Sequence, residues 1–416
     1  MKNTVKTHVK EDTPSVSAFY EQVNTFSAGL KRAVFSELTP TESTVAEHEV
    51  SKSTNKPLAG MTCLIKDNFD VAGFPTRASS LFLEEVRPSP HRDGPFVQKI
   101  RETGLTILGK TQMNEFAYGL DGANPHYGDC PHPFEPDFVS GGSSSGSAWA
   151  VAKQLVNVGF GTDTGGSIRV PSAFCGLFGL RLPPNPWAHE GCIPLAPSLD
   201  TVGWMTHNLV DLISVSEALL DLDLSEQETI LRGLQIEFPE IPVPTSAKTK
   251  ISSPTIHRDN LPDLFAPIVS QSFSIVQSLE AYEVHKGWIE RYRAQYDPSV
   301  LAKILRALSW SSGEIQKAHL VQERVKRAFS ELFEKFDFVF LPVTPGDVPR
   351  KRMSPRDRER LLQLTSPASL AGLSAITLPF RSKENPYCAL QCLLPPDRWK
   401  RVLPSLFQAM ISQEQS

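Results

Sequence analysis

Two glycine-serine clusters beside short apolar runs constrain this sequence more than any other feature. The clusters span Gly141–Ser147 and Gly161–Ser167, and the second follows the apolar run 156–160 directly. Glycine lets the backbone adopt conformations that other residues resist, so the amide groups of such a turn can point at one ligand. Upstream, the apolar run 61–65 ends in an isolated lysine, Lys66. Short apolar strands that end in polar turns are typical of sheets covered by helices.

Short apolar segments alternate with segments of helical periodicity along the chain. This alternation predicts an α/β fold, in which a large mixed, mostly parallel twisted sheet is sandwiched by helices. The expected strands are 61–65, 105–108, 156–160, 338–341, 375–379 and 387–393. The expected helices are 16–35, 95–102, 144–152, 209–222, 264–282 and 314–336.

The length of 416 residues leaves room for one large domain with shorter flanking segments. Residues 1–57 are expected to form an N-terminal helical segment followed by a polar linker over 42–57. Residues 58–400 are expected to form the main domain, and residues 401–416 a C-terminal tail helix. Within the main domain, residues 223–254 are the best candidate for a variable surface excursion.

Charge and hydropathy exclude several classes of function. The formal net charge is −4, from 42 Lys and Arg against 46 Asp and Glu, so we expect no nucleic-acid surface. The basic run 350–360 also contains Asp357 and Glu359, and is interpreted as a solvated loop or helix face. The sequence has no apolar stretch of about 18 residues and no secretory signal in its polar N-terminus. We therefore expect a cytoplasmic protein without a membrane partner.

The cysteines do not suggest a metal site. The chain has six of them and no Cys-x-x-Cys pair, which argues against zinc. We interpret them as reduced residues of an intracellular protein.

The second glycine-serine cluster has two interpretations of equal weight. Gly161, Gly165 and Gly166 follow a strand, and Pro171 is placed to begin a helix. The N–H groups of such a turn can hold the negative oxygen of a tetrahedral intermediate. A tight turn between a strand and a helix explains the same glycines without any chemistry. A phosphate cradle is disfavoured, because the Gly-x-x-x-x-Gly-Lys-Ser/Thr pattern is missing.

Lys66 is a candidate base. A lysine that closes a buried strand is expected to have a lowered pKa, because burial disfavours its charged form. A neutral lysine can accept the proton of a serine hydroxyl. The alternatives are a side chain that reaches the surface, or one that pairs with Asp67 or Asp70.

The first cluster also contains a Gly-x-Ser-x-Gly match at residues 142–146, which would make Ser144 the nucleophile of an α/β-hydrolase elbow. That elbow requires a strand directly before it, and residues 133–137 are a poor strand. It also requires a downstream acid and histidine, and the downstream histidines stand in no distinctive context. The elbow is therefore the weaker hypothesis.

These residues together resemble the amidase-signature family. The glycine-serine signature is matched over 140–152, its second half over 161–176, and the lysine strand over 60–67. Further matches lie at 109–116, 198–203, 341–345 and 368–373, with the strongest similarity over 60–203. Two departures are Ser145, where the signature commonly has glycine, and the segment 182–189, which replaces the usual loop and bears on the pocket wall.

The resemblance implies a Ser-Ser-Lys triad. Ser167 is expected to be the nucleophile, Ser143 the proton relay in a cis peptide after Gly142, and Lys66 the base. The expected oxyanion hole consists of the backbone N–H groups of Thr164, Gly165, Gly166 and Ser167. The candidate substrate contacts are Met113, Tyr118, Gly141 and Gly142.

The function implied is hydrolysis of small soluble carboxamides through an acyl-enzyme, with release of ammonia or an amine and with no metal or organic cofactor. The segment 118–127 is similar to short amidases of the indole-acetamide and allophanate-hydrolase branches. A small-molecule amide is the expected partner, and a homodimer is compatible with the sequence. One alternative is the A subunit of a tRNA-dependent amidotransferase, which needs partner chains. Another is a non-catalytic binding or scaffold protein, although the presence of all three triad residues argues against it.

Overall fold

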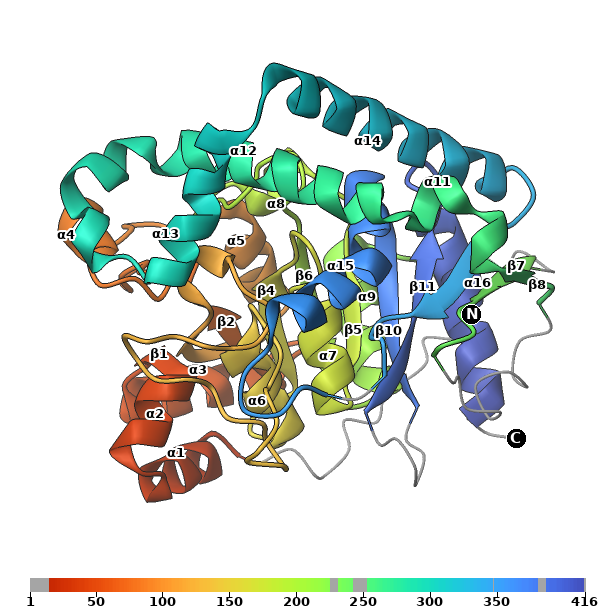
Figure 1. Cartoon of the computed structure of the whole chain (residues 1–416). Helices are drawn as coiled ribbons and strands as arrows, with labels where there is room; N and C mark the ends of the chain where they lie inside the picture. Colours follow the sequence, from red (N-terminus) through yellow and green to blue (C-terminus); the bar gives the residue numbers. More distant parts are fainter. Residues whose placement is uncertain (1–14, 225–230, 242–252, 347, 381–386, 415–416) are drawn as a thin grey trace.

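An eleven-stranded sheet runs through the protein, with helices packed on both of its faces (Figure 1). The computed structural model describes residues 15–224, 231–241, 253–346, 348–380 and 387–414. The sheet has the strand order β1-β3-β2-β4-β6-β5-β10-β11-β9-β7-β8. Its strands are β1 (Phe35–Leu38), β2 (Thr62–Lys66), β3 (Thr106–Thr111), β4 (Val158–Thr162), β5 (Phe178–Arg181), β6 (Val202–Thr206), β7 (Gly233–Glu237), β8 (Thr255–His257), β9 (Phe338–Pro342), β10 (Ser374–Phe380) and β11 (Cys388–Leu394).

The helices form two layers, one on each face of the sheet. They are α1 (Val16–Thr25), α2 (Ala28–Val34), α3 (Thr41–Lys52), α4 (Leu83–Val86), α5 (Pro95–Glu102), α6 (Ser145–Ala152), α7 (Arg169–Cys175), α8 (Pro186–His189), α9 (Leu209–Leu220), α11 (Pro262–Phe265), α12 (Pro267–Tyr292), α13 (Pro298–Leu305), α14 (Ser312–Phe333), α15 (Pro355–Leu370) and α16 (Trp399–Glu414). The long helices α12 and α14 lie side by side along the top of the molecule in Figure 1.

Side chains on β2 show how both faces of the sheet are buried. Cys63 and Ile65 pack in the cluster that contains residues of α5, α9 and α16. Leu64 points to the other face, into the cluster that contains α1 and α6. Successive side chains of a strand point to opposite faces, so a strand that is covered on both sides is apolar throughout. This explains why the strands read as short continuous apolar runs.

The sheet is mixed, as the sequence predicts, but parallel pairing is not in the majority. Among the described strands, four neighbouring pairs are parallel and six are antiparallel. The β3-β2-β4 group, next to the β1 edge, is parallel, whereas the run from β4 through β6, β5, β10 and β11 to β9 is antiparallel throughout. Short connections such as the one between β10 and β11 join antiparallel neighbours, because a parallel pair needs a long crossover.

Most expected elements are present, and the predicted helix over 95–102 matches α5 at both ends. The single helix expected over 16–35 is two helices, because Ser27 begins α2 by accepting a hydrogen bond from the N–H of Leu30. The linker expected over 42–57 was wrong, since most of it is α3. Only Thr44 and His48 of α3 are buried, so the helix carries almost no apolar face that a sequence pattern could reveal.

The flanking and variable segments contribute to the same sheet and core. Strand β1 pairs with β3, and α16 packs Val402, Leu403 and Phe407 into the core under the sheet. Within the excursion expected over 223–254, β7 pairs in parallel with β9, so this part is a sheet strand; residues 225–230 and 242–252 lie outside the described residues.

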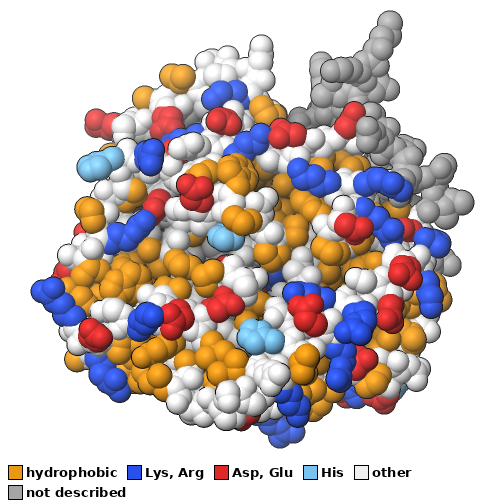
Figure 2. Space-filling model, turned by 90° about the horizontal axis from the view of Figure 1, so that it is seen from above, with side chains coloured by type: hydrophobic (Ala, Val, Ile, Leu, Met, Phe, Trp, Pro, Cys, Tyr) orange, Lys and Arg blue, Asp and Glu red, His pale blue; other side chains and the backbone are white. Residues whose placement is uncertain are grey.

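The surface carries charges of both signs. Seen from above, Lys and Arg side chains are interspersed with Asp and Glu side chains (Figure 2). None of the helices in the described ranges has both the length and the hydropathy that crossing a membrane requires.

Candidate active site

Lys66 is the last residue of β2, and its side chain is fully buried. Its Nζ donates to Ser143 Oγ at 2.8 Å and also approaches Thr162 Oγ1, at 2.9 Å, and the Thr162 carbonyl oxygen, at 3.3 Å. Burial lowers the pKa of Lys66 to about 7, although the buried carboxylates of Asp163 and Asp200 oppose this shift. The amine therefore has a substantial neutral fraction near pH 7.

The two carboxylates that could have paired with Lys66 have other partners. Asp67 forms a buried ion pair with Lys110, with 3.2 Å between Oδ1 and Nζ. Asp70 receives two hydrogen bonds from the Arg87 guanidinium, at 2.5 and 2.6 Å. The alternatives of a surface lysine and of a lysine paired with Asp67 or Asp70 are thus both wrong.

Ser143 lies in the loop before α6 and follows the cis peptide bond Gly142–Ser143, the arrangement expected from the family resemblance. Its carbonyl oxygen accepts a hydrogen bond from the Asn114 N–H at 3.3 Å. A Cβ at position 142 would lie 2.1 Å from Asn114 Oδ1, so only glycine fits there. The next residue links the two clusters, because the Ser144 N–H donates to the Ser167 carbonyl oxygen at 3.3 Å.

Ser167 lies in the turn between β4 and α7, and the carboxylate of Asp163 organises this turn. Asp163 Oδ1 accepts from the N–H of Gly166 at 2.9 Å, and Oδ2 accepts from the N–H of Ile168 at 3.0 Å. The glycine at 165 is required, because a Cβ there would lie 2.6 Å from a ring carbon of Phe273. Within the described residues, the N–H groups of Thr164, Gly165 and Ser167 make no hydrogen bond, so they remain available to a ligand.

Two buried arginines hold Asp163 in its ionised form. Arg169 Nη2 lies 2.9 Å and Arg181 Nη1 3.2 Å from Asp163 Oδ1. Burial by itself would raise the pKa of Asp163, but the two guanidinium groups outweigh it and hold the pKa well below its ordinary value. Arg169 also donates to the Thr365 carbonyl oxygen of α15 at 2.8 Å, so the ion cluster joins the turn to this helix.

A second carboxylate supports the other side of the turn. Asp200 Oδ1 accepts from the Thr164 hydroxyl at 2.5 Å, and Oδ2 accepts from the N–H groups of Leu195 and Ala196. Burial raises the pKa of Asp200 to about 6. The hydrogen bond fixes the side chain of Thr164 beside the Ser167 turn.

A pocket with about 220 Å³ of empty space opens at Ser167. Its lining residues are Ala117, Tyr118, Gly119, Leu120, Gly165, Ser167, Gln277, Arg358 and Leu362. Of the four substrate contacts expected from the sequence, Tyr118 lies in this lining, whereas Met113, Gly141 and Gly142 do not. Those three stay predictions.

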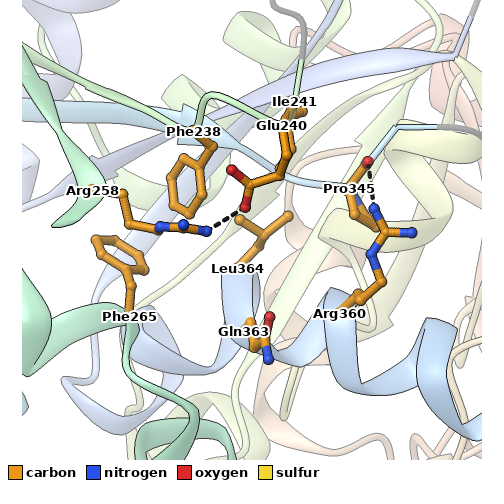
Figure 3. A pocket seen from close by; sticks show the side chains of 9 residues that line it. All are labelled: Phe238, Glu240, Ile241, Arg258, Phe265, Pro345, Arg360, Gln363 and Leu364. Atoms are coloured by element: carbon orange, nitrogen blue, oxygen red, sulfur yellow. Dashed lines mark hydrogen bonds and ion pairs between the residues drawn. The ribbon is translucent and has the colours of Figure 1, made fainter.

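A second pocket lies on the other side of α15 and contains none of the triad residues (Figure 3). Figure 3 shows Arg258 paired with Glu240, and Arg360 donating to the Pro345 carbonyl oxygen at 3.3 Å. The segment 182–189 lines neither pocket; its Trp187 packs edge-on against Phe96 of α5. This departure from the family pattern therefore does not form the wall next to Ser167.

The structure also decides against the nucleophile elbow. Ser144 follows a loop in which residues 131–142 form only isolated bridges, and its hydroxyl donates to the Thr162 carbonyl oxygen at 3.3 Å. No strand delivers Ser144 to the end of the sheet. In the described ranges, no group of three or more His, Cys, Asp or Glu side chains is placed to hold a metal ion, and the six cysteines are free.

Sequence reasoning missed the pocket residues that come from the helices. Gln277 is on α12, and Arg358 and Leu362 are on α15. The interpretation of the run 350–360 as a solvated loop or helix face fits exposed Arg356 and Arg360 but not half-buried Arg358, which lines the pocket. The available signal was spacing: Arg358 precedes the buried residues Leu361, Leu362 and Thr365 by three, four and seven positions, which is one face of a helix.

The helix-covered sheet and the buried lysine-serine pair together define a hydrolytic enzyme of the α/β class. The chain belongs to the Amidase family, whose model matches residues 15–240. It is 33% identical to Amidase 1 of Oryza sativa subsp. japonica over 367 residues, covering 79% of this chain and 84% of that protein. It is 29% identical to the indoleacetamide hydrolase of Pseudomonas savastanoi, covering 78% and 77% of the two chains.

Solved structures share the fold at lower identity. A crystal structure described as an amidase superimposes with a TM-score of 0.81 at 24% identity, covering 96% of both chains. Allophanate hydrolase of Kluyveromyces lactis superimposes with a TM-score of 0.79 at 24% identity, covering 94% of this chain and 69% of the other. These structures confirm the α/β fold, and the family match with the named relatives confirms the interpretation of the chain as an amide hydrolase.

Proposed function

We propose that the protein hydrolyses amides with Ser167 as nucleophile, Ser143 as proton relay and Lys66 as base. The observation that carries this proposal is the hydrogen bond from Lys66 Nζ to Ser143 Oγ at 2.8 Å, within a fully buried site. The lowered pKa of Lys66, about 7, supplies a base that is partly neutral at physiological pH. The Ser144-to-Ser167 backbone hydrogen bond ties the relay loop to the nucleophile turn.

The reaction proceeds in two halves. Ser167 Oγ attacks the amide carbonyl carbon while its proton passes through Ser143 to Lys66. The protonated lysine returns a proton through Ser143 to the leaving nitrogen, the C–N bond breaks, and ammonia or an amine departs. Water then attacks the ester along the same relay, which releases the carboxylic acid and restores Ser167.

The hydrogen bonds of the turn support a proposed oxyanion hole. The N–H groups of Thr164, Gly165 and Ser167 are free to receive the negative oxygen. The N–H of Gly166 already donates to Asp163, so in our proposal it shapes the turn and the other three bind the oxyanion.

We propose a small soluble amide as substrate. The supporting observation is the similarity to relatives named amidase and indoleacetamide hydrolase. A cytoplasmic location and a homodimer stay predictions, to be tested by fractionation and by light scattering of the purified protein.

A second candidate function is that of the A subunit in a tRNA-dependent amidotransferase. The chain is 30% identical over 379 residues to the A subunit of the glutamyl-tRNA(Gln) amidotransferase of Akkermansia muciniphila, covering 78% of this chain and 80% of that protein. A chain with this role is expected to need partner chains for its activity.

One experiment tests the proposal and separates it from this candidate. Purified protein alone is incubated with a panel of small amides, ammonia release is measured, and the protein is examined by mass spectrometry for an acyl group on Ser167. We expect turnover without partner chains and an acyl adduct in the wild type but not in Ser167→Ala. Activity that appears only with added partner chains would favour the amidotransferase.

A further inference from the structure

Arg358 brings a positive charge to the same pocket as Ser167. It lies in the first turn of α15 and lines the pocket together with Gln277 of α12 and Tyr118. The mechanism described above does not use any of these three side chains. The reacting serine therefore shares a small pocket with a guanidinium group whose role is unassigned.

The guanidinium of Arg358 has few protein partners. Its Nη2 makes one long hydrogen bond to Gln277 Oε1, at 3.5 Å, and its Nε is shielded from solvent without a hydrogen-bond partner. In the described part of the chain, Arg358 forms no ion pair with any carboxylate. A shielded N–H donor of a cationic group without a partner is unfavourable, so the arrangement is suited to an anion that arrives from outside.

The nearest carboxylates are engaged elsewhere. Glu359 accepts a hydrogen bond from the Ser270 hydroxyl at 2.5 Å, and Asp121 accepts from Asn114 Nδ2 at 2.8 Å. Neither forms an ion pair with the neighbouring Arg358; both carboxylates oppose the lowering of its pKa by burial, but they leave its hydrogen-bond donors available. The acidic side chains of the pocket region thus do not substitute for a bound anion.

Further cations reinforce the positive field on this side of the pocket. Lys303 of α13 donates to the Tyr118 carbonyl oxygen at 2.6 Å, and its Nζ lies 5.4 Å from the centre of the Tyr118 ring. Burial lowers the pKa of Lys303 to about 8; the nearby charges of Arg358 and Arg306 contribute to this lowering, and the carboxylates of Asp121 and Asp297 oppose it. An anion in the pocket would relieve this mutual repulsion.

We propose that the substrate is a short amide that carries a carboxylate, which Arg358 binds while the amide carbonyl lies at Ser167. This inference rests on the proposed function, because it assigns a substrate class to the same site. The planar guanidinium suits a carboxylate, since it can donate two parallel hydrogen bonds. Gln277 and the long hydrogen bond it accepts hold the guanidinium until the carboxylate arrives.

The test compares matched amides. Succinamate carries a carboxylate on the acyl side, succinamide is its neutral counterpart of similar shape, and N-acetylglycine carries the carboxylate on the amine side. We expect the wild type to prefer one of the two anionic amides over succinamide in kcat/KM, and the preferred anion tells on which side of the amide the carboxylate lies. Equal kcat/KM values for the anionic and neutral amides would overturn the proposal.

Two variants test whether Arg358 causes the preference for anionic amides. Arg358→Gln should lower kcat/KM for the preferred anionic amide by about 10- to 100-fold, the loss expected for hydrogen bonds between charged groups, and should leave succinamide within about threefold. Arg360→Gln is the matched control on the same helix, because its side chain faces the second pocket, and both substrates should be unaffected. An equal loss on both substrates in Arg358→Gln would mean that the residue is merely structural.

A binding measurement keeps the inference separate from the proposed function. Calorimetry with succinate, which has no amide bond to hydrolyse, should show anion binding to the wild type and to Ser167→Ala but not to Arg358→Gln. In Ser167→Ala, neutral succinamide should bind more weakly than succinate. Hydrolysis of neutral amides that depends on Ser167, without any anion preference, would refute the inference and leave the proposed function intact. Anion binding in a protein that hydrolyses no amide would refute the proposed function alone.

Discussion

The two walls of the active site are built in different ways. The chemical wall, Lys66, Ser143 and Ser167, comes from a strand end and two turns that lie within about one hundred consecutive residues. A side-chain hydrogen bond joins Lys66 to Ser143, and a backbone hydrogen bond joins Ser144 to Ser167. The opposite wall, Gln277, Arg358 and Leu362, comes from two helices that are far along the chain. The proposed reaction chemistry thus lies on structure that is close in the sequence, whereas the proposed substrate contacts lie on helices, of which α15 also holds the Ser167 turn through Thr365.

Replacing the proposed nucleophile, Ser167, should have the largest effect on activity. Ser167→Ala is expected to lower kcat/KM by more than about a thousandfold, because a covalent route has no substitute nucleophile at that point. Ammonia release is the measurement, and an unchanged melting temperature shows that the fold is retained. Ser144→Ala is the matched control and should keep most of the activity; the reverse pattern would restore the elbow hypothesis.

Lys66→Ala and Ser143→Ala should each lower kcat by about a hundredfold to ten-thousandfold, as is usual for the loss of general acid-base groups. The double variant should be little worse than the worse single variant, since members of one proton relay act as a unit. The three variants are compared in kcat under saturating substrate. Losses that simply multiply would show that the two side chains do not share a relay.

The pH profile should report the buried lysine. Lys66 must be neutral to accept a proton, and its pKa is lowered to about 7, so activity should rise through neutral pH and level off on the alkaline side. Below the pKa, the rate should fall about tenfold per pH unit. The Lys66→Ala variant should lose this pH-dependent rise in activity. Chelators should not change the activity of the wild type. If the Lys66→Ala variant kept the same rise in activity and required a metal ion, another group would be the base.

Removing the contact between the two walls should have the smallest effect on activity. The Thr365 hydroxyl of α15 donates to the Gly165 carbonyl oxygen at 2.6 Å. Thr365→Val removes this bond at nearly constant volume and should lower the free energy of unfolding by about 1 kcal/mol, with a loss of activity below about tenfold. Thr377→Val is the control, because in the described structure the Thr377 hydroxyl is buried without a partner and its removal should not destabilise the protein.

This division also explains what the sequence could predict. The lysine-serine pairing and the turn at Ser167 were predictable, since their signals are local: glycines where a Cβ would collide, and a lysine that closes an apolar strand. Helix α3 was not predictable, because its buried residues are a threonine and a histidine, and neither was the excess of antiparallel pairs, which depends on the order in which strands return to the sheet. Arg358 escaped notice because its environment is formed by α12, which lies about eighty residues earlier in the sequence.

The ion cluster of Asp163 with Arg169 and Arg181 has a consequence for recovery from acid. A carboxylate whose pKa is depressed in the folded state contributes stability above its unfolded pKa, and this contribution is lost only as the pH falls toward the folded value. The turn that carries Ser167 therefore keeps the ion pairs of Asp163 at mildly acidic pH, where Lys66 has already taken up its proton. Asp200, whose pKa is about 6, is also protonated there, but its oxygens can still accept the hydrogen bonds from the N–H groups of Leu195 and Ala196. The loss of activity at low pH should then be reversible. Protein held at about pH 5 and returned to pH 8 should regain its activity without having to refold.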